Sequence, residues 1–336
     1  MNLEKQIKFR HSLVFVVFLV LAGVFLNGCF HKKEKVYKIG ILSGLDYFSD
    51  AANGFKTTMA ELGYIEGKNI VYDLKKTNFD MTAYKSILKK FVADKVDMVF
   101  VFPSEASQEA KAATQGTGIP VIFAIANIED TGLINNVKEP GGNITGVRWP
   151  GPDLALRRFE IMHELVPRVK RMWVPYQKGY PIVKSQFEIL RPAAVSAGIT
   201  LIEIPANNAA ELDVELQKRT KSVNSTDAIL IIAEPLGVTP DAFVVLAKFA
   251  NKHKIPIGGA LIKVENYESL FGMTPQNVFM GKQAALLADK VLRGTPAGTI
   301  PIVSAEGYFQ INYKAAKKLG LRVPEGLLSM ADEIIR

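Results

Sequence analysis

The chain has 336 residues, of which 48% are hydrophobic and 22% are charged, and its formal net charge at pH 7 is +8. This length exceeds one ordinary hydrophobic core and suits two lobes, and a single cysteine excludes an intramolecular disulfide. The basic residues occur as scattered pairs such as Lys89-Lys90, without the long basic runs and interleaved aromatic residues of a nucleic-acid-binding groove. We therefore expect no nucleic-acid partner.

Residues 1–28 have the pattern of a secretory signal peptide. Three basic residues precede an apolar run at 13–25, which is shorter than the about 20 residues that a membrane-spanning helix needs. The run is followed by Leu-Asn-Gly-Cys, which resembles a bacterial lipobox ending at Cys29. We predict that Cys29 is lipidated, becomes the first residue of the mature protein and anchors it to a membrane. The alternative is an uncleaved N-terminal anchor with an unmodified cysteine.

A short polar segment at 29–35 is the predicted tether between the lipid and the folded body. Beyond it, apolar runs of strand length alternate with amphipathic helical patterns. Such alternation predicts a parallel sheet with helices on both faces. The predicted strands are 36–42, 70–74, 97–102 and 119–124, and the predicted helices are 50–62, 82–93 and 105–115.

Pro/Gly clusters at 139–143 and 149–152 flank a short strand at 144–147 and interrupt the alternation. The same alternation then restarts, which predicts a second lobe built like the first. Its predicted strands are 171–174, 200–204, 227–233 and 255–258, and its predicted helices are 153–165, 183–197, 209–221 and 240–253. Two further helices are predicted at 276–292 and 311–319.

We therefore predict an α/β fold of two doubly wound parallel-sheet lobes with a ligand cleft between them. The expected first lobe comprises 36–147 and about 268–300, and the second comprises 148–267 and about 301–336. In open α/β sheets, ligands bind beyond the carboxyl ends of the strands and at lobe interfaces. The loops of interest are those that follow strands: 43–48, 103–107, 126–130, 175–180, 234–238 and 259–264.

The sequence lacks the motifs by which enzymes of this fold class are recognised. It contains no Gly-rich phosphate loop, no nucleophile elbow and no pair of histidines with metal-ligand spacing. We predict that the protein is not an enzyme and holds neither a metal nor a cofactor. An exported enzyme stays open as an alternative.

Segments spread over the mature chain resemble the substrate-binding lipoproteins of ABC transporters, of the tryptophan/tyrosine type. The resemblance is carried by 62–69, 93–97, 119–123, 139–147 and 311–321. It implies a type I periplasmic-binding fold that closes on a small ligand, an amino acid or a related carboxylate. It also implies delivery of that ligand to an ABC permease in the inner membrane, from the periplasmic or extracellular face. A sensor that reports ligand occupancy to a membrane signalling partner is the alternative.

The resemblance places ligand-binding residues after strands of both lobes. Relatives that bind amino acids carry Thr-Asp-Asn after the strand that ends near Ala233, where this chain has Glu-Pro-Leu-Gly from Glu234 onward. A buried ammonium group needs an anion or several acceptors, so an amino-acid ligand would require Glu234 or Asp46 to supply them. The predicted ligand-binding residues are Ser43, Asp46, Tyr47, Ser104, Asn127, Tyr176, Gln177 and Glu234.

Ser104 has two interpretations. It lies at the start of the predicted helix 105–115, where free backbone N–H groups and the positive helix end favour a carboxylate. Serine is also a common N-cap residue, and capping alone would explain its position.

Overall fold

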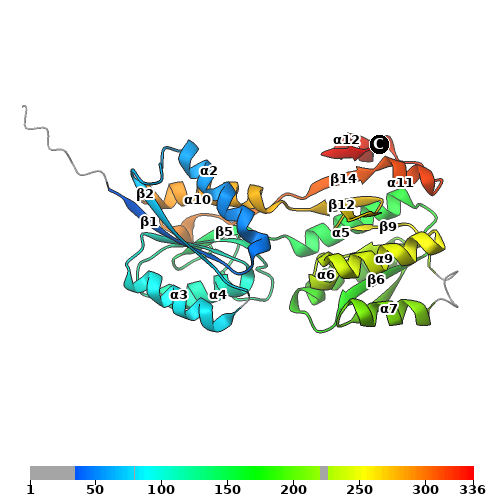
Figure 1. Ribbon diagram of the computed structural model, residues 1–336, viewed down its shortest axis with the longest axis horizontal. Helices are drawn as coiled ribbons and strands as arrows, with labels where there is room; N and C mark the ends of the chain where they lie inside the picture. Colours follow the sequence, from blue (N-terminus) through cyan, green and yellow to red (C-terminus); the bar gives the residue numbers. More distant parts are fainter. Residues whose placement is uncertain (1–34, 79, 220–225) are drawn as a thin grey trace, which may run out of the picture.

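The computed structural model describes residues 35–78, 80–219 and 226–336, without the side chain of Tyr47. The predicted signal peptide, Cys29 and nearly all of the predicted tether lie outside the described residues. Figure 1 shows two lobes side by side, with the chain crossing between them along one side. In the part of the chain that the structure describes, no helix is long and apolar enough to span a bilayer.

The first lobe is built on a six-stranded sheet in the order β13-β5-β4-β3-β1-β2, in which all neighbouring strands are parallel. Helices α2 and α10 cover one face of the sheet, and α3 and α4 cover the other. The central strands are continuous apolar runs because both of their faces are buried. The elements are β1 (Tyr37–Ser43), β2 (Ile70–Lys76), β3 (Met98–Phe102), β4 (Val121–Ala126), β5 (Ile144–Arg148), β13 (Val303–Ser304), α2 (Ser49–Glu61), α3 (Met81–Ala93), α4 (Ser104–Thr114) and α10 (Asn277–Leu292), with the 3-10 helices η1 (Asp46–Phe48) and η3 (Ala297–Thr299).

The second lobe is built on a seven-stranded sheet in the order β15-β14-β12-β9-β8-β6-β7. The neighbouring strands β12, β9, β8, β6 and β7 pair in parallel, whereas β14 is antiparallel to β12. Helices α5 and α6 pack on one face, and α7 and α9 pack on the other. The elements are α5 (Gly151–Leu165), β6 (Arg171–Gln177), α6 (Pro181–Ser196), β7 (Thr200–Ala206), α7 (Ala209–Lys218), β8 (Ala228–Ile231), α8 (Pro235–Val238), α9 (Pro240–His253), β9 (Ile257–Gly259), β12 (Phe271–Thr274), β14 (Tyr308–Asn312), α11 (Tyr313–Lys318), α12 (Glu325–Met330) and β15 (Glu333–Ile335), and β10 (Lys263–Val264) pairs with β11 (Tyr267–Glu268) in a small hairpin.

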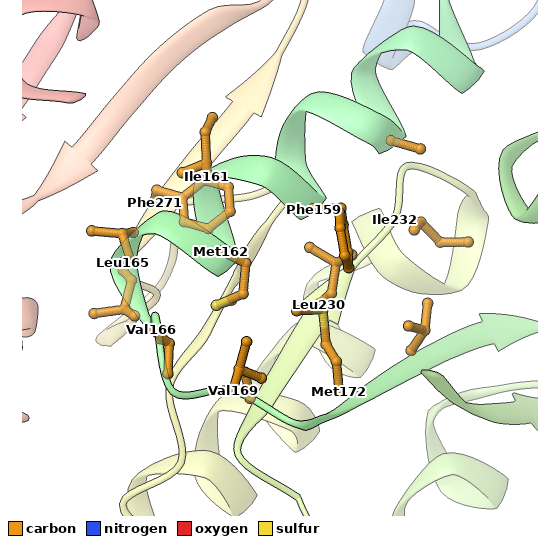
Figure 2. Packing of buried hydrophobic residues seen from close by; sticks show 14 of the residues in the cluster. Phe159, Ile161, Met162, Leu165, Val166, Val169, Met172, Leu230, Ile232 and Phe271 are labelled. Atoms are coloured by element: carbon orange, nitrogen blue, oxygen red, sulfur yellow. The ribbon is translucent and has the colours of Figure 1, made fainter. Parts of the chain in front are cut away.

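The core under α5 shows how one helix face joins several strands. Phe159, Met162 and Leu165 recur at helical spacing on α5 and are buried. They belong to one cluster with Leu230 of β8 and Phe271 of β12 (Figure 2). The predicted fold class, two lobes with doubly wound parallel sheets, is confirmed. The antiparallel edge formed by β14 was not predicted.

Three segments cross between the lobes among the described residues: from β5 to α5, from β12 to α10, and from β13 to β14. The lobe boundaries expected at about 268 and 301 precede the second and third of these crossings. The difference arises because β12 pairs within the second sheet and β13 within the first. β13 is the edge strand of the first sheet, whereas β12 lies between β9 and β14 in the second, and in both cases the chain completes a strand before it crosses.

Two glycines allow α2 and α10 to approach each other closely. A Cβ atom at Gly54 of α2 would overlap the backbone carbonyl of Val278, and one at Gly281 of α10 would overlap the carbonyl of Ala51. The contact is therefore reciprocal, with each helix placing a glycine against the backbone of the other. This pair of helices covers one whole face of the first sheet.

Candidate ligand-binding site

The first lobe brings two of the predicted site residues into contact. Ser104 opens α4 directly after β3, and Asn127 follows β4, the neighbour of β3 in the sheet. The Asn127 main-chain N–H donates to Ser104 Oγ at 3.0 Å, so the two loops are joined. The N-cap residue of α4 is Pro103, not Ser104, and the Ser104 hydroxyl thus holds the neighbouring loop instead of capping its helix.

The strand before Asn127 has an irregular backbone. Ile125 adopts a φ of 54°, a left-handed conformation that is unfavourable for a β-branched residue. The register between β4 and β5 also shifts between Phe123 and Ala126. Strained residues and strand irregularities concentrate near binding sites, where they change the direction in which a chain leaves the sheet. Here they set the path of the loop that starts at Asn127.

The loop after β1 makes contacts of its own. Ser43 is buried, and its hydroxyl donates to the Leu45 carbonyl oxygen at 2.8 Å. Asp46 is exposed and forms an ion pair with Lys76 at the end of β2, with 2.7 Å between Oδ1 and Nζ. The hydrogen bond from Lys76 lowers the pKa of Asp46, and a second one from Ser49 lowers it further. Both predicted residues therefore stabilise this loop, and the Tyr47 side chain lies outside the described part of the chain.

In the second lobe, the Glu234 carboxylate is enclosed by backbone donors. The residue is 2% exposed, and its oxygens accept hydrogen bonds from the N–H groups of Gln177 (2.9 Å), Leu236 (3.1 Å) and Gly237. Burial raises the pKa of Glu234 to about 7, although the three N–H groups act in the opposite direction. The carboxylate caps the short helix α8 and fixes it to the end of β6. Most of its acceptor capacity is used within the lobe.

The other predicted residues of the second lobe also have internal partners. The Tyr176 ring packs edge-on against Phe187 of α6, with 5.1 Å between ring centroids. Burial raises the pKa of Tyr176, and the nearby negative charge of Glu203 contributes. Gln177 is bound to Glu234 through its main-chain N–H. β6 is buried at four consecutive positions, so its sequence pattern could not reveal that the Tyr176 side chain packs against the core of its own lobe.

Tyr180 occupies a position that the sequence analysis did not select as a ligand-binding residue. It precedes α6 and is half-buried, and burial raises the pKa of its hydroxyl to about 12. The negative charges of Glu105 and Glu234 add to this increase. Glu105 belongs to α4 of the first lobe and Glu234 to the second, so negative charges of both lobes act on the Tyr180 hydroxyl.

Gln186 of α6 is a second residue that the sequence analysis missed. Its side chain is completely buried, and Nε2 donates to the carbonyl oxygen of Ala233 at 3.0 Å. A Cβ atom placed on Gly151 would lie 3.9 Å from Gln186 Cγ and 3.3 Å from Asn127 Oδ1. The signal in the sequence is a polar residue on the otherwise apolar face formed by Val183, Phe187 and Leu190.

Charged groups connect the lobes around these residues. Arg148, at the first crossing, donates to Glu129 of the first lobe (3.0 Å) and to Asp153 of α5 (2.6 Å). Lys184 of α6 lies 3.8 Å from Asp130 of the first lobe. The lobes are thus in contact at the loops that carry Asn127 and Tyr180.

Two open surface cavities lie away from these loops. One, of about 370 Å³, is lined by Tyr37, Asp97 and Pro120 at the amino ends of the first-lobe strands. The other, of about 500 Å³, lies between α10 and the third crossing, beside Phe279 and Tyr308. None of the predicted ligand-binding residues lines either cavity. Within the described ranges, no group of three or more His, Cys, Asp and Glu side chains could hold a metal ion.

Two doubly wound lobes connected by crossing segments define a type I periplasmic-binding fold. Residues 39–335 match the profile of a family described as ABC transporter substrate binding protein, and the chain belongs to this family. The family predicted from the sequence is thus confirmed. Its members bind small-molecule substrates of ABC transporters outside the cytoplasm, so this chain is an extracytoplasmic binding protein.

Individual relatives agree with this assignment. A tyrosine-binding protein of Clostridioides difficile (strain R20291) is 28% identical over 287 residues, which are 82% of this chain and 77% of that protein. An ABC domain from Streptococcus pneumoniae, solved in complex with L-Trp, has a TM-score of 0.72 and 25% identity, covering 90% of this chain and 100% of that one. A ligand-free, open substrate-binding protein with adhesive properties from Clostridium difficile shares the fold, with a TM-score of 0.73, 22% identity and coverage of 90% and 99%.

Proposed function

We propose that this protein captures an amino acid or a related carboxylate between its lobes and delivers it to an ABC permease. The observation that carries the proposal is the pairing of Ser104 with Asn127 at the amino end of α4, across Gly151 from Gln186 of the second lobe. The relatives that bind tyrosine and L-Trp favour an aromatic amino acid as the ligand.

The amino end of α4 suits the carboxylate of such a ligand. The helix has 11 residues, its first N–H groups have no intrahelical acceptor, and no side chain caps it. Its partial positive charge stabilises an anion. Ser104 Oγ accepts from Asn127, which leaves the hydroxyl hydrogen available as a donor to the ligand.

A panel of ligands tests this function. We expect L-tryptophan or L-tyrosine to bind the purified protein, as measured by calorimetry, and to raise its thermal stability. At a ligand concentration of a hundred times the dissociation constant, the free energy of unfolding should increase by about 2.7 kcal/mol. Sugars and polyols of similar size are the matched controls. Binding of a control sugar with no response to any amino acid or carboxylate would refute the proposed ligand class.

We also propose that Cys29 carries the lipid that keeps the protein at the membrane. The sequence from 13 to Cys29 supports this, because the apolar run is too short for a membrane span and ends in a lipobox-like motif. The Cys29→Ser variant is expected to accumulate as unprocessed precursor or to leave the membrane fraction, as followed by fractionation and intact-mass measurement. Normal processing together with normal membrane attachment of this variant would contradict lipidation.

A further inference from the structure

The buried amide of Gln186 has an oxygen that no described residue satisfies. Nε2 donates to the carbonyl oxygens of Ala233 (3.0 Å) and Ile182 (3.3 Å). Two carbonyl acceptors on the same side of the amide fix which atom is nitrogen and which is oxygen. Oε1 therefore faces away from both carbonyls, and it has no hydrogen-bond partner among the described residues. A buried acceptor without a hydrogen-bond partner costs free energy. A donor supplied from outside the chain would remove this cost and so bind more tightly.

The surroundings of Gln186 place its side chain beside the proposed ligand site. A Cβ atom on Gly151 would lie 3.3 Å from Asn127 Oδ1 and 3.9 Å from Gln186 Cγ, so Gly151 separates the two side chains. Asn127 is in turn bound to Ser104, the residue proposed to meet the ligand carboxylate. Asn127 Oδ1 of the first lobe and the Gln186 side chain of the second thus lie on either side of Gly151, close to the group that would hold the acid end of an amino acid.

The two carboxylates expected to bind an ammonium group are engaged elsewhere. Glu234 accepts three backbone N–H groups and caps α8. Asp46 is exposed and paired with Lys76, on the loop after β1. A ligand ammonium needs several acceptors when it leaves water, and neutral side-chain oxygens can supply them.

We propose that Gln186 Oε1, together with the Asn127 amide, binds the amino group of the ligand in place of a carboxylate. This inference rests on the proposed function, because it assumes an amino-acid ligand. It makes Gln186 a specificity-determining residue that distinguishes an amino acid from the same molecule without its amino group.

The test compares two ligands on two proteins. Wild-type protein is titrated with L-tryptophan and with indole-3-propionate, which lacks only the amino group, and the same pair is measured on Gln186→Met. Tyrosine and 3-(4-hydroxyphenyl)propionate form an equivalent pair. We expect wild type to prefer the amino acid by about 10- to 100-fold, the range for a hydrogen bond to a charged group. In Gln186→Met this preference should fall about tenfold or more, while the affinity for the des-amino ligand changes little.

Two variants control for structural effects. Ser185→Ala removes a hydrogen bond to the same Ile182 carbonyl in the same turn of α6, and it should keep the wild-type preference. Gly151→Ala leaves Gln186 intact and places a methyl group 3.3 Å from Asn127 Oδ1, between the two side chains proposed to bind the amino group, so it should reduce the preference even if Gln186→Met folds poorly.

The outcomes distinguish the role of Gln186 from the proposed function of the protein. A preference that is unchanged in both Gln186→Met and Gly151→Ala overturns the role of Gln186 while leaving an amino-acid ligand intact. Equal loss of affinity for both ligands shows that Gln186 only supports the fold, and it also overturns the inference. Failure of wild type to bind either amino acid refutes the proposed function itself, and the inference with it.

Discussion

Gly281→Ala and Gly54→Ala are each expected to lower the free energy of unfolding by about 1–3 kcal/mol or more. A methyl group at either position would overlap a backbone carbonyl of the facing helix, which cannot rotate away as a flexible side chain can. Helices α2 and α10 would have to separate and lose apolar contacts over one face of the first sheet. Urea denaturation of the variants measures the change.

The sign of the change in stability distinguishes close helix packing from helix propensity. Alanine stabilises a helix interior by about 1 kcal/mol relative to glycine, so helix propensity alone predicts that both variants become more stable. Leu286→Ala on the exposed side of α10 is the control and should stay within about 0.5 kcal/mol of wild type. The double variant should cost less than the sum of the two single ones, because either methyl group already separates the helices. Increased stability of both single variants would show that the helices do not pack as closely as described.

Glu234 is expected to make stability depend on pH in a direction that is unusual for a carboxylate. Its pKa is about 7 in the folded protein, against 4.5 for an ordinary glutamate, because burial disfavours the charged form. The folded state therefore binds the proton of the Glu234 carboxyl group more tightly than the unfolded state does. The resulting stabilisation is complete below about pH 4.5 and is lost as the pH rises through about 7.

The Glu234→Gln variant isolates this contribution, since glutamine does not titrate. We expect the free energy of unfolding of wild type, minus that of the variant, to fall by about 3 kcal/mol between pH 4.5 and a pH above 7. Urea denaturation at a series of pH values gives both curves. A difference that grows with pH would show that the three backbone N–H donors outweigh burial and keep the carboxylate charged.

The order of strands and helices was largely predictable because burial leaves a local pattern. The run Met98–Phe102 is apolar at every position, as a strand covered on both faces must be. The end of the chain was different. The helix expected at 311–319 begins only at Tyr313, after β14 has paired with β12, and Asn312 caps it by accepting a hydrogen bond from the Ala315 N–H. Pairing between distant segments has no local signature, so the antiparallel edge was missed.

The sequence was enough to predict the family, the two-lobe α/β fold and the loops in which ligand-binding residues were expected. The rule that parallel strands end at one edge brought Ser104 and Asn127 into the same prediction, and the structure places them in contact. The packing of distant segments was needed to show that Glu234 is enclosed by backbone N–H groups and that Gln186 carries a buried oxygen without a partner among the described residues. The position of a residue along the chain depends on local patterns, whereas the direction and partners of its side chain depend on which distant segments pack around it.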